Sequence, residues 1–394
     1  MKTVRISLLI LGTWVLWLVV SQYLLGIRFH FEEHFPFEGT ALYNPYEGLD
    51  ARNWIKCNFH AHAKAWNGVT NGHGTASDVH DAYRSLHYGV HCVSNYHFID
   101  STGASEQSFI PAYEHGYNLT KTHQLILGSQ QVQWLDYLLP QTIHNKQDVL
   151  KNLKTQNNVI ILNHPHLRKG YTRDDLSQLS DYDCMEVLNP AIISTGEWDA
   201  ALSAGKKVFI VGNDDTHDVL AKARLGKMCT LVNVPDNQGE LVLRALKAGQ
   251  SYGVEVGENQ SIDSIPLLRQ LRMDGAAMTV EMDQVAQEVT VTGQNGKVLA
   301  SYQNTNIIRY CLQKSAHYAR ATFKYSNGTT IYLNPVFFTP PTGYEATVAY
   351  VDNSSTTLYR ALGISILILW ILAVRWMVGY PRNLRYRTGQ FSIR

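Results

Sequence analysis

Histidines and carboxylates carry the candidate chemistry of this sequence. The chain has 16 histidines, and 13 of them lie between His60 and His217. One residue separates His60 from His62, and one residue separates Asp215 from His217. On an extended chain, residues i and i+2 point to the same side, so each pair can present two donor atoms to one metal ion. Mixed nitrogen and oxygen donors without thiolate suit zinc, manganese or iron.

Further candidate ligands follow at the ends of other segments. Glu114 and His123 lie in AYEHGYNLTKTHQLILG, and His164 ends the apolar run VIILNHP. A glutamate has two carboxylate oxygens, so Glu114 is suited to bridging two ions. Glu186, in MEVLN, has the pattern of an ordinary acid at a strand end. The strand-like runs end at His60 and His62, at His97, at His164, and at Asp215 and His217, which predicts one shared site.

Alternating strand-like and helical segments must position these residues. Between 54 and 256, the strand-like runs are CVSNYH, VIILNHP, CMEVLNP, KVFIVGND and CTLVNV. Between them lie segments with helical spacing of apolar residues, such as KQDVLKNLKTQ and ELVLRALKAG. This order predicts an α/β fold with a parallel sheet or a barrel. In an α/β barrel, the carboxyl ends of the strands meet on one face, where the active site is built.

The motifs His60-Ala61-His62, Glu114, His123, His164-Pro165 and Asp215-Thr216-His217, in this order, resemble the PHP (polymerase and histidinol phosphatase) superfamily. The resemblance covers residues 54–256. It implies a distorted seven-stranded β/α barrel of TIM-like form and metal-dependent hydrolysis of phosphoesters. It also implies two or three divalent metal ions.

The resemblance assigns the ligands residue by residue. The first ion would be held by His60, His62, Glu114 and Asp215, and the second by Glu114, His123 and His164. The third would be held by His217, with His73 and His97 as its companions. The catalytic residues are then Asp215, His217 and His62.

Two positions depart from the family pattern. The family often opens with Asp-x-His-x-His, and here Asn58 stands at the first position. The usual Thr-Asp-His is replaced by Asn95-Tyr96-His97, so Tyr96 aligns with the expected histidine. In a strand, an offset of one residue points the side chain to the opposite face. We therefore expect the third metal site, at His73, His97 and His217, to be weaker than the other two.

Three side chains after His164 are candidates for substrate binding. His166, Arg168 and Lys169 can neutralise phosphate oxygens. The sequence therefore favours a metal-dependent phosphoesterase acting on a phosphorylated small molecule or envelope component. A metal-dependent hydrolase of an amide or ester bond, and a non-catalytic envelope module, are the alternatives. A neutral substrate would not need the cationic side chains, and turnover would separate an enzyme from a binding module.

The segment 260–350 has a different pattern. Polar and apolar residues alternate in MTVEM, EVTVT and YARATFKY, which is typical of strands. Asp274-Gly275, Asn295-Gly296 and Asn327-Gly328 predict hairpin turns. These features predict a small, separable antiparallel β-sandwich that supplies no metal ligand.

Both ends of the chain have apolar segments. Residues 6–27 carry no charge and predict a transmembrane anchor, with a cleaved signal peptide as the alternative. Residues 358–378 predict a second transmembrane helix, followed by the basic tail 379–394. The positive-inside rule places both termini in the cytoplasm and residues 28–357, with the catalytic domain, outside it.

Composition excludes several classes of protein. Lys and Arg total 34 and Asp and Glu total 33, giving a net charge of +1, so no excess of basic residues indicates nucleic-acid binding. The five cysteines show no Cys-x-x-Cys spacing, which argues against a disulfide scaffold and a thiolate zinc finger. The expected partners are therefore a phosphorylated substrate and a membrane.

Overall fold

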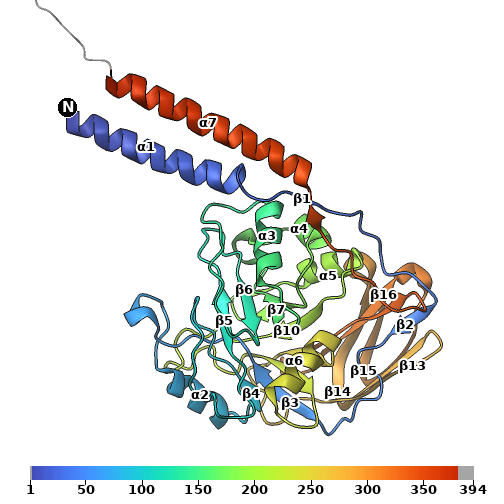
Figure 1. The fold of residues 1–394 in the computed structure, drawn as a ribbon. Coiled ribbons are helices and arrows are strands. Elements are labelled where there is room, and N and C mark those ends of the chain that lie inside the picture. Colours follow the sequence, from blue (N-terminus) through green and yellow to red (C-terminus); the bar gives the residue numbers. More distant parts are fainter. Residues whose placement is uncertain (1, 380–394) are drawn as a thin grey trace, which may run out of the picture. The chain divides into compact units, whose positions relative to one another are not determined.

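The computed structural model describes residues 2–379 and divides the chain into two compact units. One unit is Phe29–Tyr350, and the other contains the two terminal segments (Figure 1). The predicted basic tail lies, from residue 380 onward, outside the described residues.

Two long helices form the terminal unit, α1 (Lys2–Tyr23) and α7 (Asn353–Gly379). Both are long and apolar enough to cross a membrane, as the sequence predicts. The Trp370 indole of α7 donates to Thr13 Oγ1 of α1 at 2.9 Å, and Arg360 Nε of α7 donates at 3.0 Å to the carbonyl of Leu25, which follows α1. Such hydrogen bonds between helices are a recognised means of association in membranes.

Most of the metal ligands described below lie on or next to the strands of a six-stranded sheet. Its strands are β5 (Ala112–His115), β6 (Gln124–Leu127), β7 (Val159–Leu162), β8 (Cys184–Asn189), β9 (Ile192–Ile193) and β10 (Phe209–Gly212). The order is β10-β8-β7-β6-β5, with β9 paired to β8. Strands β7, β8 and β10 run parallel, whereas β5 and β6 pair antiparallel.

Both faces of this sheet are buried. On one face, Ile160 and Leu162 pack with apolar residues of the helices α3 (Ile143–Leu153), α4 (Arg173–Gln178) and α5 (Thr195–Ser203). On the other, Val159 and Ile161 pack with residues of α6 (Gly239–Ala248) and of the second sheet. Alternate residues of one strand therefore enter two cores, which explains the uninterrupted apolar run VIIL.

The second sheet has eleven strands. These are β2 (Ala41–Tyr43), β3 (Trp54–Asn58), β4 (Val90–His91), β11 (Met228–Asn233), β12 (Ser251–Glu255), β13 (Leu268–Asp274), β14 (Ala277–Gly293), β15 (Lys297–Cys311), β16 (Tyr318–Lys324), β17 (Thr330–Leu333) and β18 (Val336–Thr339). Helix α2 (Ala76–Ser85) connects β3 to β4, which run parallel. The two-residue strands β1 (Phe29–His30) and β19 (Tyr350–Val351) pair with each other in a small separate sheet.

The α/β class is confirmed, but the described residues form no closed seven-stranded barrel. The strands divide between two sheets. Between the edges of β10 and β11, the Thr230 hydroxyl accepts from the Gly212 N–H and donates to the Gly212 carbonyl, both at 2.9 Å. A single bridge between Tyr96 and Glu114 joins the other side. Side chains and isolated bridges thus replace a continuous ladder at the two places where a barrel would close.

The three predicted hairpin turns lie in the segment 260–350. Gly275 connects β13 to β14, Gly296 connects β14 to β15, and Gly328 connects β16 to β17. Their φ values of +56°, +71° and +90° lie in the left-handed region that glycine tolerates. The predicted separate sandwich is not observed, because β17 pairs with β12 and extends the sheet of β3, β4 and β11. That the segment folds independently stays a prediction.

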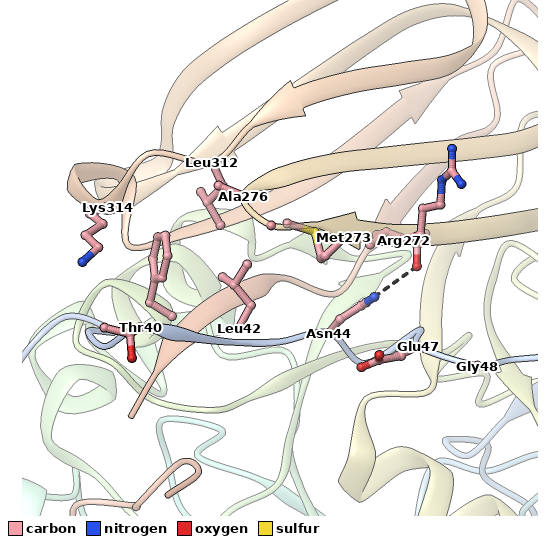
Figure 2. Close-up of a pocket in the computed structure, with 13 residues that line it drawn as sticks. Thr40, Leu42, Asn44, Glu47, Gly48, Arg272, Met273, Ala276, Leu312 and Lys314 are labelled. Atoms are coloured by element: carbon pink, nitrogen blue, oxygen red, sulfur yellow. Dashed lines mark hydrogen bonds between the residues drawn. The ribbon is translucent and has the colours of Figure 1, made fainter. Parts of the chain in front are cut away.

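A cavity of about 560 Å³ lies beside this extended sheet. Figure 2 shows apolar side chains, including Leu42 and Met273, between Lys314 at one end and Arg272 at the other. The Asn44 amide donates to the Leu271 carbonyl at 3.1 Å along one wall. None of the candidate metal ligands lines this cavity.

A buried ion pair connects β16 to α5. Arg320, 5% exposed, donates from Nε and Nη2 to the two Asp199 oxygens at 2.9 and 2.7 Å, and the Tyr318 hydroxyl also donates to Asp199. We expect Asp199→Ala to lower the free energy of unfolding by about 3–5 kcal/mol, because it leaves a buried guanidinium without its partner. Lys324→Ala, which removes an exposed pair with Glu288, should cost less than about 1 kcal/mol. If chemical denaturation gave the same loss of unfolding free energy for both variants, the buried pair would not stabilise the packing of β16 against α5.

Candidate metal centre

Seven of the nine predicted ligands come together at one edge of the sheets. His60 and His62 directly follow β3, while His164 and Asp215 follow β7 and β10. His123 precedes β6, which runs antiparallel to β7, so its start lies at the same edge as the end of β7. The extended segments carrying the two paired motifs lie side by side, because the His62 N–H donates to the Thr216 carbonyl at 2.8 Å.

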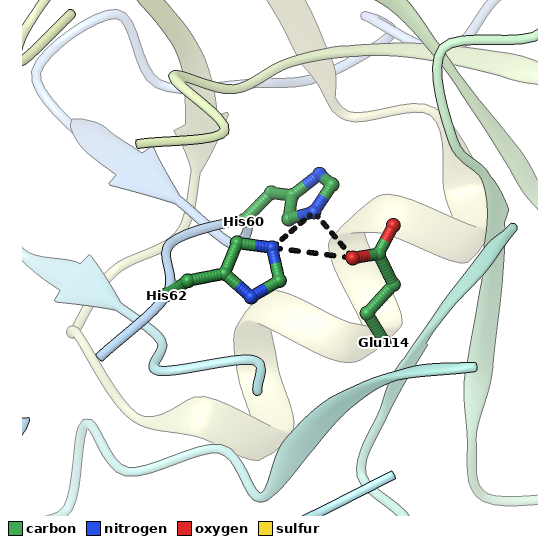
Figure 3. A group of neighbouring side chains, drawn as sticks. All are labelled: His60, His62 and Glu114. Carbon is green, nitrogen blue, oxygen red and sulfur yellow. Dashed lines mark hydrogen bonds and ion pairs between the residues drawn. The ribbon is translucent and has the colours of Figure 1, made fainter. Parts of the chain in front are cut away.

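Three groups of donor atoms form, each with its atoms within 4.8 Å of one another. The first is His60, His62 and Glu114 (Figure 3). The other two are Glu114, His123 and His164, and His62, Asp215 and His217. All seven residues were predicted as ligands from the sequence, and the structure brings them into one cluster.

The first group presents converging lone pairs. His60 Nδ1 lies 2.9 Å from Glu186 Oε1, so Nδ1 carries the hydrogen and Nε2 carries a lone pair. His60 Nε2 and His62 Nε2 lie 3.2 Å apart and 3.3 and 3.2 Å from Glu114 Oε2. Glu114 Oε2 is buried and accepts no hydrogen bond. Because like charges and lone pairs repel, this arrangement fits a divalent cation bound among the three atoms.

The second group uses the other oxygen of the same carboxylate. His123 Nδ1 lies 2.7 Å and His164 Nε2 3.5 Å from Glu114 Oε1. The Asn163 amide also donates to Oε1, at 3.0 Å. Glu114 therefore faces one group of imidazoles with each oxygen, as the bridging role predicted for it requires.

Glu186 is one residue of the site whose role the sequence did not reveal. Its carboxylate is fully buried and accepts hydrogen bonds from His60 Nδ1, from the His164 N–H at 3.1 Å, and from the amides of Asn189 and Asn213. A carboxylate on the second nitrogen of a metal-binding histidine fixes the ring orientation and raises its basicity. The available signal was its place in MEVLN, and the structure puts it inside β8 rather than at the end of that strand.

Electrostatics keeps the carboxylates ionised. Burial opposes ionisation of Glu114, but His123 and His60 hold its pKa well below the usual value. Burial likewise opposes ionisation of Asp215, and His60 and His62 lower its pKa. Burial and the neighbouring His62 lower the pKa of His217 to about 4. Against the effect of burial, the carboxylates in turn raise the pKa values of His60, His62 and His164, so a divalent ion would bind here by displacing protons from these imidazoles.

The backbone at two ligands lies in the left-handed region. His164 has φ of 29° and Asp215 has φ of 44°. Residues other than glycine rarely adopt this conformation, which costs about 1–3 kcal/mol and is concentrated at functional sites. The hydrogen bonds around these residues hold them there, including those from the His164 N–H to Glu186 and from Asn189 Nδ2 to Asp215 Oδ2, at 3.2 Å.

The structure does not bring His73 and His97 into the cluster. His97 Nδ1 donates to the Gln133 carbonyl at 3.2 Å, and its Nε2 accepts from the Gly116 N–H at 3.0 Å. The His73 side chain is 66% exposed and lies 3.4 Å from Asp218. Tyr96 lies at the cluster instead, with its ring 4.7 Å from that of His62. This placement agrees with the one-residue offset seen in the sequence.

A cavity of about 580 Å³ opens beside the cluster. His123, His164, Asp215 and His217 line it. Three cationic side chains also line it: Lys121, Arg168 and Arg224. Of the predicted substrate-binding residues, Arg168 is therefore at the cavity, whereas His166 Nδ1 lies 2.7 Å from Glu197 and Lys169 is not among the lining residues. Lys121 and Arg224 stand outside any recognisable motif, so the sequence did not indicate them.

Comparison with solved structures finds a similar protein. It is described as a two-domain protein containing a predicted PHP-like metal-dependent phosphoesterase, from Bacteroides vulgatus. It is 13% identical, with a TM-score of 0.42, and the match covers 82% of this chain and 99% of that chain. No family model and no curated protein matches. The neighbour bears the family name that the motifs predicted, and the chemistry of this chain follows from its own side chains.

We expect two tightly bound metal ions per chain. An imidazole nitrogen has one lone pair, so His62 Nε2 cannot serve both groups that contain it, whereas Glu114 can serve two ions through its two oxygens. Tyr96→His should allow a further ion to bind beside His217, and Tyr96→Phe should leave the count at two. Elemental analysis of the purified full chain after dialysis measures the count. Three ions of equal affinity in the unmodified protein would contradict this expectation.

Proposed function

We propose that this chain is a metal-dependent hydrolase that cleaves phosphoester bonds. The main support is the Glu114 carboxylate, whose two oxygens face two separate groups of imidazoles beside a cavity lined by cations. His60, His62, Glu114 and Asp215 would hold one ion, and Glu114, His123 and His164 would hold the other. When bound, such ions supply Lewis acidity that activates water and neutralises charge on phosphate oxygens. Zinc, manganese and iron suit this donor set.

The residues around the cavity complete the proposed reaction. Arg168, Lys121 and Arg224 bind the oxygens of the phosphate group and orient it toward the cluster. The Lys121 ammonium lies 5.7 Å from the Tyr96 ring centroid, and its charge acts on the ligand His123, whose pKa it lowers together with burial. His217 Nδ1 donates to the Asp215 carbonyl at 3.0 Å, which leaves the Nε2 lone pair to accept a proton from the attacking water.

Charge at the cavity favours a phosphorylated substrate over a neutral amide or ester. None of its three cations forms an ion pair within the described residues. A bound dianion would be attracted by all three cations, whereas a neutral substrate would gain no such attraction. The intact set of donor atoms supports an enzyme rather than a degenerate module.

We also propose that α1 and α7 both cross a membrane. Their length and apolar composition support this placement. The arginines expected in the tail would hold the C-terminus in the cytoplasm, by the positive-inside rule. Residues 29–350 would then act on phosphorylated molecules outside the cytoplasm, such as components of the cell envelope.

Turnover tests the proposed chemistry. We expect Asp215→Ala and His62→Ala to lower kcat by roughly 100-fold or more against a panel of phosphomonoesters and phosphodiesters, because loss of a ligand should exceed the effect of losing an outer partner. Asp215 lines the cavity, so its removal should change the melting temperature little, and the melting temperature of each variant is measured alongside turnover. Activity like that of the unmodified protein in metal-replete Asp215→Ala would refute the assignment.

In the same assay, Arg168→Ala should mainly raise KM, because a contact with the phosphate contributes to binding in the ground state as well as in the transition state. Lys169→Ala is the matched control, since the neighbouring residue carries the same charge but does not line the cavity. If both variants raised KM equally, the net positive charge of this region, rather than direct contact of Arg168 with the phosphate, would determine substrate affinity.

Reporter fusions test the topology. Alkaline phosphatase needs disulfides to be active, so it is inactive in the cytoplasm. We expect a fusion after Arg394 to be inactive and an insertion at Gly343 to be active. Gly343 lies in a loop, and a Cβ atom added there would meet no other atom within 4 Å, so this position should tolerate the insertion. An active C-terminal fusion would contradict two crossings with both termini inside.

A further inference from the structure

A second basic cavity lies at the opposite edge of the six-stranded sheet from the metal cluster. Its volume is about 380 Å³. Lys206 and Lys207 line it and precede β10, whereas Asp215 follows β10. Asp183 also lines it and precedes β8. The chain from Lys207 to Asp215 corresponds to as much as about 26 Å when extended. The two cavities share no lining residue.

Four lysines and two carboxylates line this basic cavity. The lysines are Lys154, Lys206, Lys207 and Lys247, and the carboxylates are Asp181 and Asp183. Lys154 pairs with both oxygens of Asp183 at 2.7 Å, and Asp181 accepts from Gln147 at 2.8 Å. Within residues 2–379, the other three lysines have no carboxylate within 4.0 Å. The cavity therefore has an excess of positive charge.

The unpaired lysines are held in place rather than extended into solvent. Lys206 is 7% exposed, and its Nζ donates to Thr347 Oγ1 at 2.7 Å and to the Gln178 carbonyl at 3.3 Å. The Lys207 ammonium lies 5.1 Å from the Tyr43 ring centroid and 5.5 Å from that of Tyr344. The Lys247 ammonium donates to the Gln156 carbonyl at 2.6 Å. Neutral partners thus orient three ammonium groups without neutralising them.

Burial makes these charges unfavourable in the absence of an anion. Burial lowers the pKa of Lys206 to about 8, although Glu32 opposes the shift, and it lowers the pKa of Lys207, although Asp183 opposes it. Burying an ammonium group that no carboxylate contacts raises the free energy of the folded protein. A bound anion would offset this cost. Lysines bind phosphate as point charges, and three of them suit a dianion.

The rest of the lining indicates the shape of the ligand. Leu179, Tyr182, Tyr344 and Val348 supply apolar and aromatic surface next to the lysines. Inorganic phosphate would leave this surface unused, whereas an organic phosphate would cover it. We propose that this cavity binds a phosphate monoester through Lys206, Lys207 and Lys247, at a site separate from the metal centre. The proposal does not depend on the proposed hydrolase activity.

Calorimetric titration of the metal-free full chain in detergent tests the site. Chelation of metal stops turnover, so binding is measured independently of hydrolysis. The probe is phenyl phosphate, and the variant is Lys206→Met/Lys207→Met/Lys247→Met. We expect its affinity to fall at least tenfold in the variant and to be unchanged in Lys297→Met, which removes an exposed lysine elsewhere. Equal affinity in the unmodified protein and the triple variant would overturn the proposal.

Two further measurements keep the result interpretable. If the triple variant does not fold, as judged by its melting temperature, Lys207→Met/Lys247→Met replaces it, because Lys206 is the most buried of the three. Nanodiscs with and without phosphatidic acid, whose headgroup is also a phosphate monoester, identify the source of the ligand. Binding to phosphatidic acid that the variant loses assigns a lipid, and lysine-dependent binding of phenyl phosphate without it assigns a soluble molecule. Absence of both types of binding would refute the site.

Discussion

The buried carboxylate of Glu114 is the group on which the functional edge of this protein depends. It is fully enclosed, and one oxygen faces His60 and His62 while the other faces His123 and His164. A buried carboxylate is costly unless charges or hydrogen bonds compensate it. The imidazoles on both sides supply that compensation, and a bound cation would add to it. Glu114 thus joins residues from distant parts of the chain into one cluster.

The surrounding strands are arranged so that they serve this cluster. Strands β3, β7 and β10 end at one edge, and β6 begins there, so four separate segments deliver their polar residues to the same place. Glu186 then orients His60 and the His164 backbone. The opposite ends of β8 and β10 carry the lysine-lined cavity. One parallel core therefore separates two charged edges, because the apolar interior of the sheet excludes charge.

Much of the site was predictable because its chemistry is local in the sequence. The spacing of His60 with His62, and of Asp215 with His217, follows from the two-residue repeat of an extended chain, and the structure confirms that each pair joins the cluster. The offset of Tyr96 and His97 was also readable, since adjacent residues on a strand face opposite sides. The α/β class and the glycine turns at 275, 296 and 328 depend on similarly local rules.

The tertiary structure was needed for the features that depend on contacts between distant segments of the chain. Whether the strands close into a barrel depends on pairing between distant edges, and here the Thr230 side chain takes the place of a ladder at one of them. The segment 260–350 joins the larger sheet through β12 and β17, because an unpaired strand edge gains hydrogen bonds by pairing. Packing of distant segments also determined the positions of Lys121, Arg224 and Glu186 at the site. Sequence thus determined the donor atoms and their local geometry, whereas long-range packing determined their neighbours, because contacts between distant segments leave no periodic pattern in a single sequence.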